Sequence, residues 1–381
     1  MQGSNVSAPI ANHSGTIFIA IELSQKSWVL TVHSPDRDGI SQRKLKGGDH
    51  AGLLRFISDL RERVRGKLGT LPKVITCYEA GYDGFWLHRL LVAAGIMNYV
   101  LDPASIPVER RGRRVKTDGI DGQVLLRTLM AHVRGEPRVV RIVRVPSREQ
   151  EDARRVNRER ERLISEQTAH TNRIKALLRQ QGMAVGKPRR RDWLKWLAEQ
   201  RDWEGQPVLP AMLAELTREH ARLMLVCEQL EAATRELSAA TAPAAQQRAH
   251  LERLKSLGLV TATGLANEVF YKDFRNRRQV AAYVGITPSP WQSGGTDHEQ
   301  GISKAGNPRA RRMAIELAWL WVRHQPDSAL TQWFKARTLN AGKRIKRIAI
   351  VALARKLIVA LWRYLTTGLV PQGAVLKPVK V

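Results

Sequence analysis

The order of short apolar runs and helical patterns in residues 16–121 restricts the folds that this part of the chain can adopt. Residues 16–34 predict two strands around a polar turn, and a third strand is expected near residues 40–45. Residues 49–65 carry leucine, isoleucine and valine at helical spacing. The pattern continues with a strand at 73–78, a helix at 84–94, a strand at 97–101 and a helix that begins near residue 117.

This succession of three strands, helix, strand, helix, strand and helix is the order of the ribonuclease-H-like fold, an α/β architecture. In that fold the first and fourth strands lie side by side at the centre of the sheet. The last helix then packs against the sheet. Residues that end the two central strands are therefore expected to meet residues at the start of that helix.

Four acidic residues occupy these positions. Glu22 lies in the first apolar run and Glu79 ends the fourth, while Asp118 and Asp121 share one face of the expected helix because they are three residues apart. Burying a carboxylate costs free energy, so acids at such places indicate a metal or catalytic site. A solvated surface helix is the ordinary alternative for the aspartate pair alone. The order of all four acids favours a site for divalent ions that position a phosphodiester.

The charge of the chain indicates a polyanionic partner. Lysine and arginine number 63 against 35 aspartates and glutamates, which gives a formal charge of +28. Five cations precede the aspartate pair and predict backbone phosphate contacts, with a solvated loop as the alternative. These five are Arg110, Arg111, Arg113, Arg114 and Lys116.

The middle of the chain predicts two long helices. Apolar residues in 147–181 and 213–237 recur at three- and four-residue intervals, as in a coiled coil or a dimerising arm. Between them, Arg189, Arg190 and Arg191 lie beside two tryptophans. Such a segment can stack on unpaired bases, or its tryptophans can anchor a small helical core. The alanine- and proline-rich residues 238–250 are expected to form a linker.

The last third of the chain contains a predicted anion site and a candidate nucleophile. Asn307 is a suitable helix N-cap with proline at the next position, and the positive end of that helix lies among four cations. Ser293 lies in a glycine-rich segment expected to be a loop, where it is either a nucleophile or an ordinary loop serine. The four cations at that helix end are Lys304, Arg309, Arg311 and Arg312.

The residues after 367 are expected to form a loose tail.

Cysteine use and hydropathy indicate a cytosolic protein. Cys77 and Cys227 are the only cysteines, which predicts neither a disulfide framework nor a zinc cluster. The first 15 residues lack the arrangement of a signal peptide. The longest apolar stretch, residues 348–365, contains three cations and is not expected to span a bilayer.

Six short motifs occur along the chain in the order Ile-Ala-Ile-Glu22-Leu-Ser, Cys-Tyr-Glu79-Ala-Gly, Lys-Thr-Asp118-Gly-Ile-Asp121, Tyr-Val-Gly-Ile-Thr-Pro, Gln-Ser293-Gly and Gly-Ile-Ser-Lys-Ala-Gly-Asn. Together they resemble the DEDD transposases of insertion-sequence family one hundred and ten, which are bridge-RNA-guided recombinases. The resemblance covers nearly the whole chain, and the motifs follow the order of the family.

The resemblance implies a DNA transposase that cleaves and rejoins strands through a covalent phosphoserine link from Ser293. It implies that Glu22, Glu79, Asp118 and Asp121 bind Mg²⁺ or Mn²⁺. The implied partners are donor and target DNA, a structured noncoding bridge RNA, and further copies of the chain in a dimer or tetramer with sites shared between subunits. Glu22 replaces the aspartate common in the family, which moves the carboxylate outward by about one C–C bond length.

The implied domain organisation divides the chain into three folded parts and two tails. Two other functions fit the residues alone: a metal-dependent RuvC-like junction nuclease and a noncatalytic nucleic-acid-binding protein. The expected parts are a disordered tail at 1–14, a RuvC-like domain at 15–146, a coiled-coil helical domain at 147–250, a mainly helical serine-bearing domain at 251–367 and a tail at 368–381.

Overall fold

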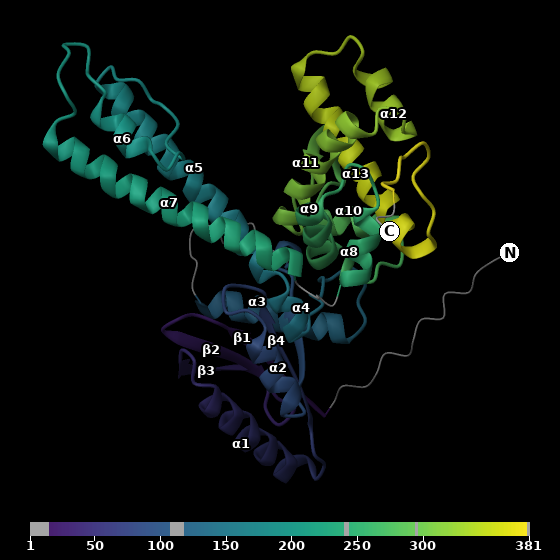
Figure 1. Ribbon diagram of the computed structural model, residues 1–381. Coiled ribbons are helices and arrows are strands. Elements are labelled where there is room, and N and C mark those ends of the chain that lie inside the picture. Colours follow the sequence, from purple (N-terminus) through teal and green to yellow (C-terminus); the bar gives the residue numbers. More distant parts are fainter. Residues whose placement is uncertain (1–14, 107–117, 240–243, 294–295, 379–381) are drawn as a thin grey trace. The chain divides into compact units, whose positions relative to one another are not determined.

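The computed structural model describes residues 15–106, 118–239, 244–293 and 296–378. The chain divides into two compact units, Met1–Val145 and Pro146–Val381 (Figure 1). The first unit is built on a five-stranded sheet, and the second is mainly helical. The protein thus has the mixed α/β architecture expected from its sequence.

The sheet of the first unit has the strand order β3-β2-β1-β4-β5. β1 pairs antiparallel with β2 and parallel with β4, so the first and fourth strands are neighbours, as in a ribonuclease-H-like fold. All five predicted strands are confirmed. Their bounds are β1 Thr16–Glu22, β2 Ser27–His33, β3 Ile40–Lys46, β4 Lys73–Glu79 and β5 Met97–Leu101.

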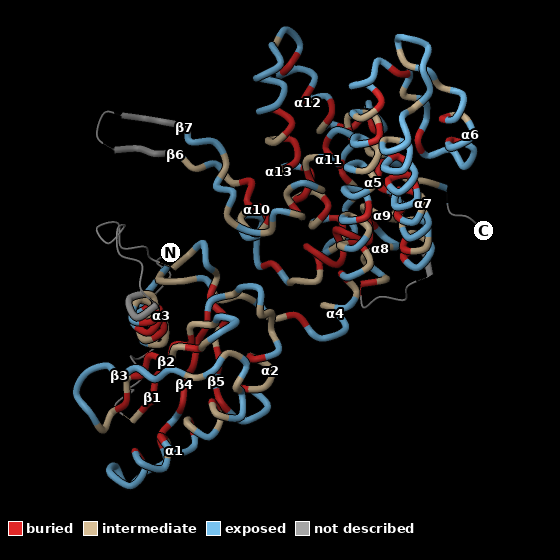
Figure 2. The backbone as a smooth tube through the Cα atoms, turned by 90° about the vertical axis from the view of Figure 1, so that its left-hand side faces the viewer, coloured by how far each residue is buried: buried red, intermediate tan, exposed pale blue. Residues whose placement is uncertain are grey.

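Helices cover both faces of this sheet. Successive side chains of β1 point to opposite faces, and the apolar side chains on each face are buried against a helix. Ile17, Ile19 and Ile21 pack on one face against α1 (His50–Leu68) and α2 (Trp86–Ala93). Phe18 and Ala20 pack on the other face against α3 (Asp118–Val133). Figure 2 shows the buried strands in red between these helices. The apolar character of nearly all of β1 follows from burial on both sides.

The second unit contains two long helices, α5 (Arg155–Gln180) and α7 (Pro210–Ala239), which pack side by side (Figure 1). They are antiparallel, because Arg160 Nε contacts Thr234 Oγ1 near one end while Arg173 Nη1 contacts Glu219 near the other. Short helices α4 (Arg148–Asp152) and α6 (Trp193–Ala198) accompany them.

The tryptophans of α6 belong to a small helical core. Trp193 is 1% exposed and its ring stacks on His220 at 5.0 Å between centroids. Trp196 packs against the same core and limits the space at Gly186. Of the two sequence interpretations for this segment, the structure therefore supports the packing role for Trp193 rather than base stacking.

The rest of the second unit is a helical bundle with a hairpin. Its core contains Leu265, Leu317, Trp321, Leu353 and Leu357, all at most 1% exposed. The elements are α8 Ala245–Glu252, α9 Leu259–Leu265, the π-helix η3 Ala266–Phe270, α10 Arg277–Val284, β6 Pro288–Ser293, β7 Thr296–Ile302, α11 Pro308–His324, α12 Ala329–Thr338 and α13 Lys343–Thr367.

Two sequence expectations about connecting segments were wrong. The expected linker 238–250 contains most of α8, since its alanines and glutamines are good helix formers. The expected loose tail is held in place up to residue 377. Gln325 is fully buried and its side chain bonds both the N–H and the C=O of Val375, at 2.8 and 3.0 Å. Lys377 N donates to Arg253 O at 2.6 Å.

None of the helices in the described part of the chain combines the length and the apolar character that crossing a bilayer requires.

Gly122 gives a test of how α3 docks on the sheet. A Cβ at this buried position would collide with Thr31 Oγ1 on β2. We expect Gly122→Ala to lower the free energy of unfolding by about 1–3 kcal/mol, as overpacking does. Thr31→Ala in the same chain should recover part of that loss. Urea unfolding followed by circular dichroism measures both.

Gly66→Ala is the matched control, because Gly66 lies in α1 with no atom within 4 Å of an added Cβ. Alanine should stabilise that helix slightly. A Gly122→Ala variant as stable as Gly66→Ala would contradict the docking of α3 described above.

Candidate active-site residues

Glu22 and Glu79 lie next to each other at one edge of the sheet. Glu22 is the last residue of β1 and Glu79 the last of β4. The parallel register pairs Ile21 with Tyr78, so the two acids follow at neighbouring positions where both strands end. Strands 57 residues apart in the sequence thus bring two carboxylates to the same carboxyl edge.

Both acids also belong to the face of the sheet that α3 covers. Phe18 and Ala20 of β1 pack against α3, and Glu22 continues this alternate series. Cys77 of β4 packs on the same face, and Glu79 is the next residue of its series. Glu22 and Glu79 therefore lie on the same face of the sheet as the apolar residues that contact α3, at the ends of the two strands.

The two helix acids start α3. Asp118 is its first residue, and Asp121 is half-buried within its first turn. The following residue, Gly122, lies against Thr31, which pairs with Ala20 across β1 and β2. The first turn of α3 is thus held against β2 at Thr31, whose partner Ala20 on β1 lies two residues before Glu22.

Carboxylate oxygens are the ligands that Mg²⁺ and Mn²⁺ prefer, so the chemistry of this set suits the expected cofactor. Among the side chains that the structure describes, no three histidines, cysteines, aspartates or glutamates lie close enough to hold a metal ion. The Asp118 side chain lies outside the described residues. The structure places Glu22 and Glu79 at neighbouring strand ends on the face that α3 covers, and their joint metal binding with Asp118 and Asp121 stays a prediction.

Ser293 is the last residue of β6, in the second unit. It pairs with Thr296 of β7 in an antiparallel hairpin. The expectation of a glycine-rich loop was wrong for this serine, because the hairpin strands extend up to Gly294 and Gly295, which lie outside the described residues. The acids belong to the first unit.

The base of this hairpin is fixed by a close approach of two backbone segments. Lys304 N donates to Gly285 O at 3.1 Å, and Asn307 N donates to Tyr283 O at 2.8 Å. Gly285 and Gly306 have φ of 73° and 114°, and a Cβ on either would overlap the backbone of the opposite segment. Gly285 and Gly306 therefore allow the two backbone segments to approach closely enough for the hydrogen bonds that hold the base of the hairpin.

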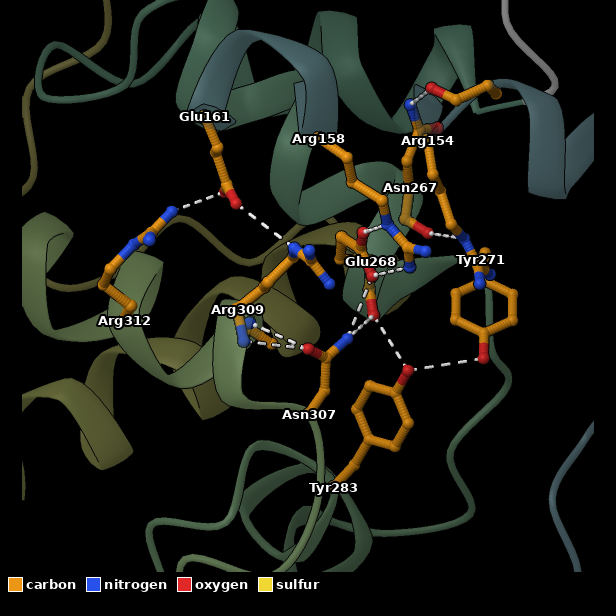
Figure 3. Close-up of polar contacts among 12 residues, drawn as sticks. Arg154, Arg158, Glu161, Asn267, Glu268, Tyr271, Tyr283, Asn307, Arg309 and Arg312 are labelled. Carbon is orange, nitrogen blue, oxygen red and sulfur yellow. Dashed lines mark hydrogen bonds and ion pairs between the residues drawn. The ribbon is translucent and has the colours of Figure 1, made fainter. Parts of the chain in front are cut away.

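The structure gives several predicted nucleic-acid-binding cations an internal partner. Arg309 and Arg312 both pair with Glu161 of α5, at 3.2 and 2.6 Å (Figure 3). Arg311 Nη1 donates to Lys304 O at 2.9 Å.

The other predicted cations divide into three groups. Arg190 forms a tight ion pair with Asp192. Arg189, Arg191 and Lys304 are exposed and form no ion pair within the described part of the chain. Arg110, Arg111, Arg113, Arg114 and Lys116 lie outside the described residues.

The predicted anion site at the start of α11 is filled by the protein itself. Asn307 caps the helix, its side chain accepting from Arg309 N and Ala310 N at 3.0 and 3.2 Å. The same side chain donates to Glu268 Oε2 at 3.0 Å. Glu268 is 3% exposed and supplies the negative charge at this helix end. The prediction of a free anion site there was wrong for this reason.

Glu268 is held by Arg158 of α5, whose Nε and Nη2 donate to its two carboxylate oxygens at 2.6 and 3.0 Å (Figure 3). Burial raises the pKa of Glu268, but the hydrogen bonds and charge of Arg158 outweigh it, and the pKa lies below its usual value. The same pairing raises the pKa of Arg158. Arg154 lies 4.0 Å above the Tyr271 ring and donates to Asn267 O.

Sequence reasoning missed this network because its partners are about 110 residues apart. One signal was available. Arg154, Arg158 and Glu161 recur at the spacing of one helix face, and all three turn out to contact the bundle.

Glu268→Gln keeps the shape of the side chain and removes its charge. We expect a loss of about 2–3 kcal/mol in the free energy of unfolding, because Arg158 is left partly buried without a counter-charge. The stability that the carboxylate provides is present above the usual glutamate pKa and is lost as pH falls through the lowered folded pKa. Urea unfolding at pH 7 and at low pH measures this difference.

Glu62→Gln is the matched control, since Glu62 pairs with Arg65 at 3.3 Å with both side chains about 60% exposed. That pair should contribute about 0–1 kcal/mol. Equal effects of the two substitutions, or an effect of Glu268→Gln that does not shrink in acid, would refute the buried pair.

Two family models match the chain. One, described as a DEDD transposase model, matches residues 11–183 and so includes the sheet and its acids. The other, described as transposase IS116/IS110/IS902 family, matches residues 248–333, which include Ser293 and the hairpin.

Curated relatives give the same result. The chain is 47% identical to "Putative transposase y4rJ" of Sinorhizobium fredii, over 95% of each chain. It is 24% identical to the transposase for insertion sequence element IS1328 of Yersinia enterocolitica, over 80% of this chain and 87% of the relative. For the transposase of element IS1111A of Coxiella burnetii the identity is 26%, over 73% and 74%. The chain belongs to the IS116/IS110/IS902 family of DEDD transposases and is a DNA transposase.

Proposed function

We propose that this transposase cleaves and rejoins DNA through a covalent phosphoserine link formed by Ser293, with divalent metal bound by Glu22, Glu79, Asp118 and Asp121. The observation that carries the proposal is the adjacency of Glu22 and Glu79 on the face of the sheet that α3 covers. Two carboxylates placed side by side repel each other, so their adjacency at the ends of paired strands favours a shared functional site over two unrelated surface acids. Family membership argues against a noncatalytic binder.

In this proposal Ser293 Oγ gives up its proton and bonds to the scissile phosphorus, while the strand oxygen leaves and takes up a proton. A hydroxyl of the second strand later displaces Ser293, which restores the serine and joins the DNA. Mg²⁺ or Mn²⁺, when bound, neutralises phosphate charge and polarises the scissile bond. The link conserves the phosphodiester energy, which agrees with a sequence that contains no Walker phosphate-binding motif.

The hairpin suits a nucleophile because its backbone is fixed at the base. Two hydrogen bonds join residues 283–285 before the hairpin to residues 304–307 after it, and Gly285 and Gly306 allow this close approach, so strand β6 starts from a defined position. The acids and the serine belong to different units of the chain. We propose that one active site takes its acids and its serine from different copies of the chain, in a dimer or tetramer.

A structured noncoding RNA that pairs with donor and target DNA completes the proposal. The high positive charge supports an RNA and a DNA partner together. Several arginines that sequence reasoning assigned to nucleic acid instead form internal ion pairs, so base-specific contacts by these side chains are few. Base pairing by an RNA would supply the sequence specificity that they lack.

Ser293→Ala tests the serine chemistry without knowledge of the target sequence. DNA covalently attached to the protein is recovered from expressing cells under denaturing conditions and sequenced. We expect the wild-type chain to yield adducts at discrete sites and Ser293→Ala to reduce them by at least about 100-fold, since no other hydroxyl replaces the nucleophile. Ser289→Ala, on the same strand, is the control and should keep the adducts. Strand cleavage that persists in Ser293→Ala would identify a metal-dependent nuclease instead.

RNA that copurifies with the chain tests the guide. Sequencing should recover one discrete structured species with two loops, which remains bound after a wash in high salt because its fold is recognised in addition to its charge. The same preparation from a chain lacking residues 147–381 sets the background. Random cellular fragments from the full-length chain would contradict RNA guidance.

A further inference from the structure

A cavity of about 700 Å³ opens in the second unit, away from the contacts described so far. Residues of α10, α12 and α13 line it, together with residues 369–372, which follow α13. Its volume is within the range of sites that take a small organic ligand or one nucleotide.

The cavity carries uncompensated positive charge. No acidic residue lines it, and none of its cations forms an ion pair within the described part of the chain. Lys356 has a ring contact only, 4.8 Å from the centroid of Trp333. This differs from Arg158, Arg309 and Arg312, whose charges are neutralised internally. The cations that line the cavity are Arg277, Arg278, Arg355, Lys356 and Arg363.

The cavity also has an apolar part, formed by Leu330, Val359, Leu369 and Val370. Leu369, one of these residues, is 67% exposed. A metal cation would be repelled by the five positive side chains, and an inorganic anion would leave the apolar surface unused. The combination suits a molecule that has both anionic groups and an apolar body.

The wall made by residues 369–372 is fixed in place. Ala329 N donates to Gln372 O at 3.0 Å, and the buried side chain of Gln325 bonds both backbone groups of Val375. A Cβ at Gly373 would overlap the backbone of Asp327. The cavity is therefore formed before a ligand binds, which lowers the cost of binding.

The cavity adjoins the hairpin of the proposed nucleophile. Thr287 lines the cavity, and β6 begins at the next residue and ends at Ser293. An extended strand of that length covers about 20 Å at roughly 3.3 Å per residue. A nucleic-acid strand that passes Ser293 can thus reach the cavity within a few nucleotides.

We propose that this cavity binds one unpaired nucleotide of a nucleic-acid strand, with the base against the apolar residues and the neighbouring phosphates on the arginines. A paired base stays in its stack and cannot enter, so the site selects single strands. The proposal rests on the proposed function, because only a strand held near Ser293 has reason to pass this cavity. Its role is to fix a displaced or looped-out nucleotide beside the strand that is cut.

Binding of strands with and without bases tests this. The full-length chain carrying Ser293→Ala is titrated with fluorescent 12-nucleotide strands of oligo-thymidine, oligo-uridine, and an abasic strand with the same number of phosphates. We expect about tenfold tighter binding to a base-bearing strand than to the abasic one. Ala360→Phe, which fills the cavity, and Leu369→Ser, at an exposed wall position, should each abolish that preference.

Variants that remove charge distinguish binding in the cavity from general electrostatic attraction between the protein and a nucleic-acid strand. Arg277→Ala with Arg278→Ala should weaken all strands and reduce the salt dependence by roughly 1.4 in log–log slope, at about 0.7 per lost phosphate contact. Arg344→Ala with Arg347→Ala, on α13 outside the cavity, should keep the tenfold preference for bases. Whichever of the DNA and RNA strands shows the preference identifies the source of the nucleotide.

Equal binding of base-bearing and abasic strands by the Ser293→Ala chain would overturn the proposal. So would a preference that survives both Ala360→Phe and Leu369→Ser in variants with unchanged melting temperature, or displacement of the strands from the cavity by anionic lipid vesicles. Because binding needs no strand cleavage, failure of the phosphoserine chemistry would show separately, as DNA adducts that persist in Ser293→Ala.

Discussion

The parallel pairing of β1 with β4 is the interaction on which the candidate site depends. It sets Glu22 beside Glu79, although a helix and two strands separate them in the sequence. A register shift by one residue would move one of the acids to the opposite face, because side chains alternate along a strand. The buried isoleucines of β1 on one face and Phe18 and Ala20 on the other hold that register.

Much of the first unit could be predicted from its sequence. Strands buried on both faces appear as continuous apolar runs, and the helices between them have clear spacing and caps, such as Asp49 before α1. The acids end these runs, and the change from apolar to charged residues made them recognisable; in the structure Glu22 is half-buried and Glu79 is exposed. The face on which they lie became clear only with the structure, because alternation cannot be detected in a strand that is apolar throughout.

The second unit was harder to predict because its specific contacts join distant parts of the chain. Arginines near the N-terminus of α11 suggested an anion site, yet the anion is Glu268, which the sequence places within an apolar stretch about 40 residues earlier. Likewise, the segment after α13 has the composition of a tail but is fixed by the buried side chain of Gln325 and by backbone hydrogen bonds to Ala329 and Arg253. The helical spacing of Arg154, Arg158 and Glu161 indicates a contact face, but it does not identify the distant residues that this face contacts.

The central claim is that acids from β1, β4 and α3 form one divalent-metal site. Manganese binding to the full-length chain, measured by electron paramagnetic resonance, tests it most directly. We predict that Glu79→Gln weakens Mn²⁺ binding by at least about tenfold, while Asp59→Asn, on α1 at the opposite face of the sheet, leaves it unchanged. Equal Mn²⁺ affinity for the wild-type chain and Glu79→Gln would contradict the claim.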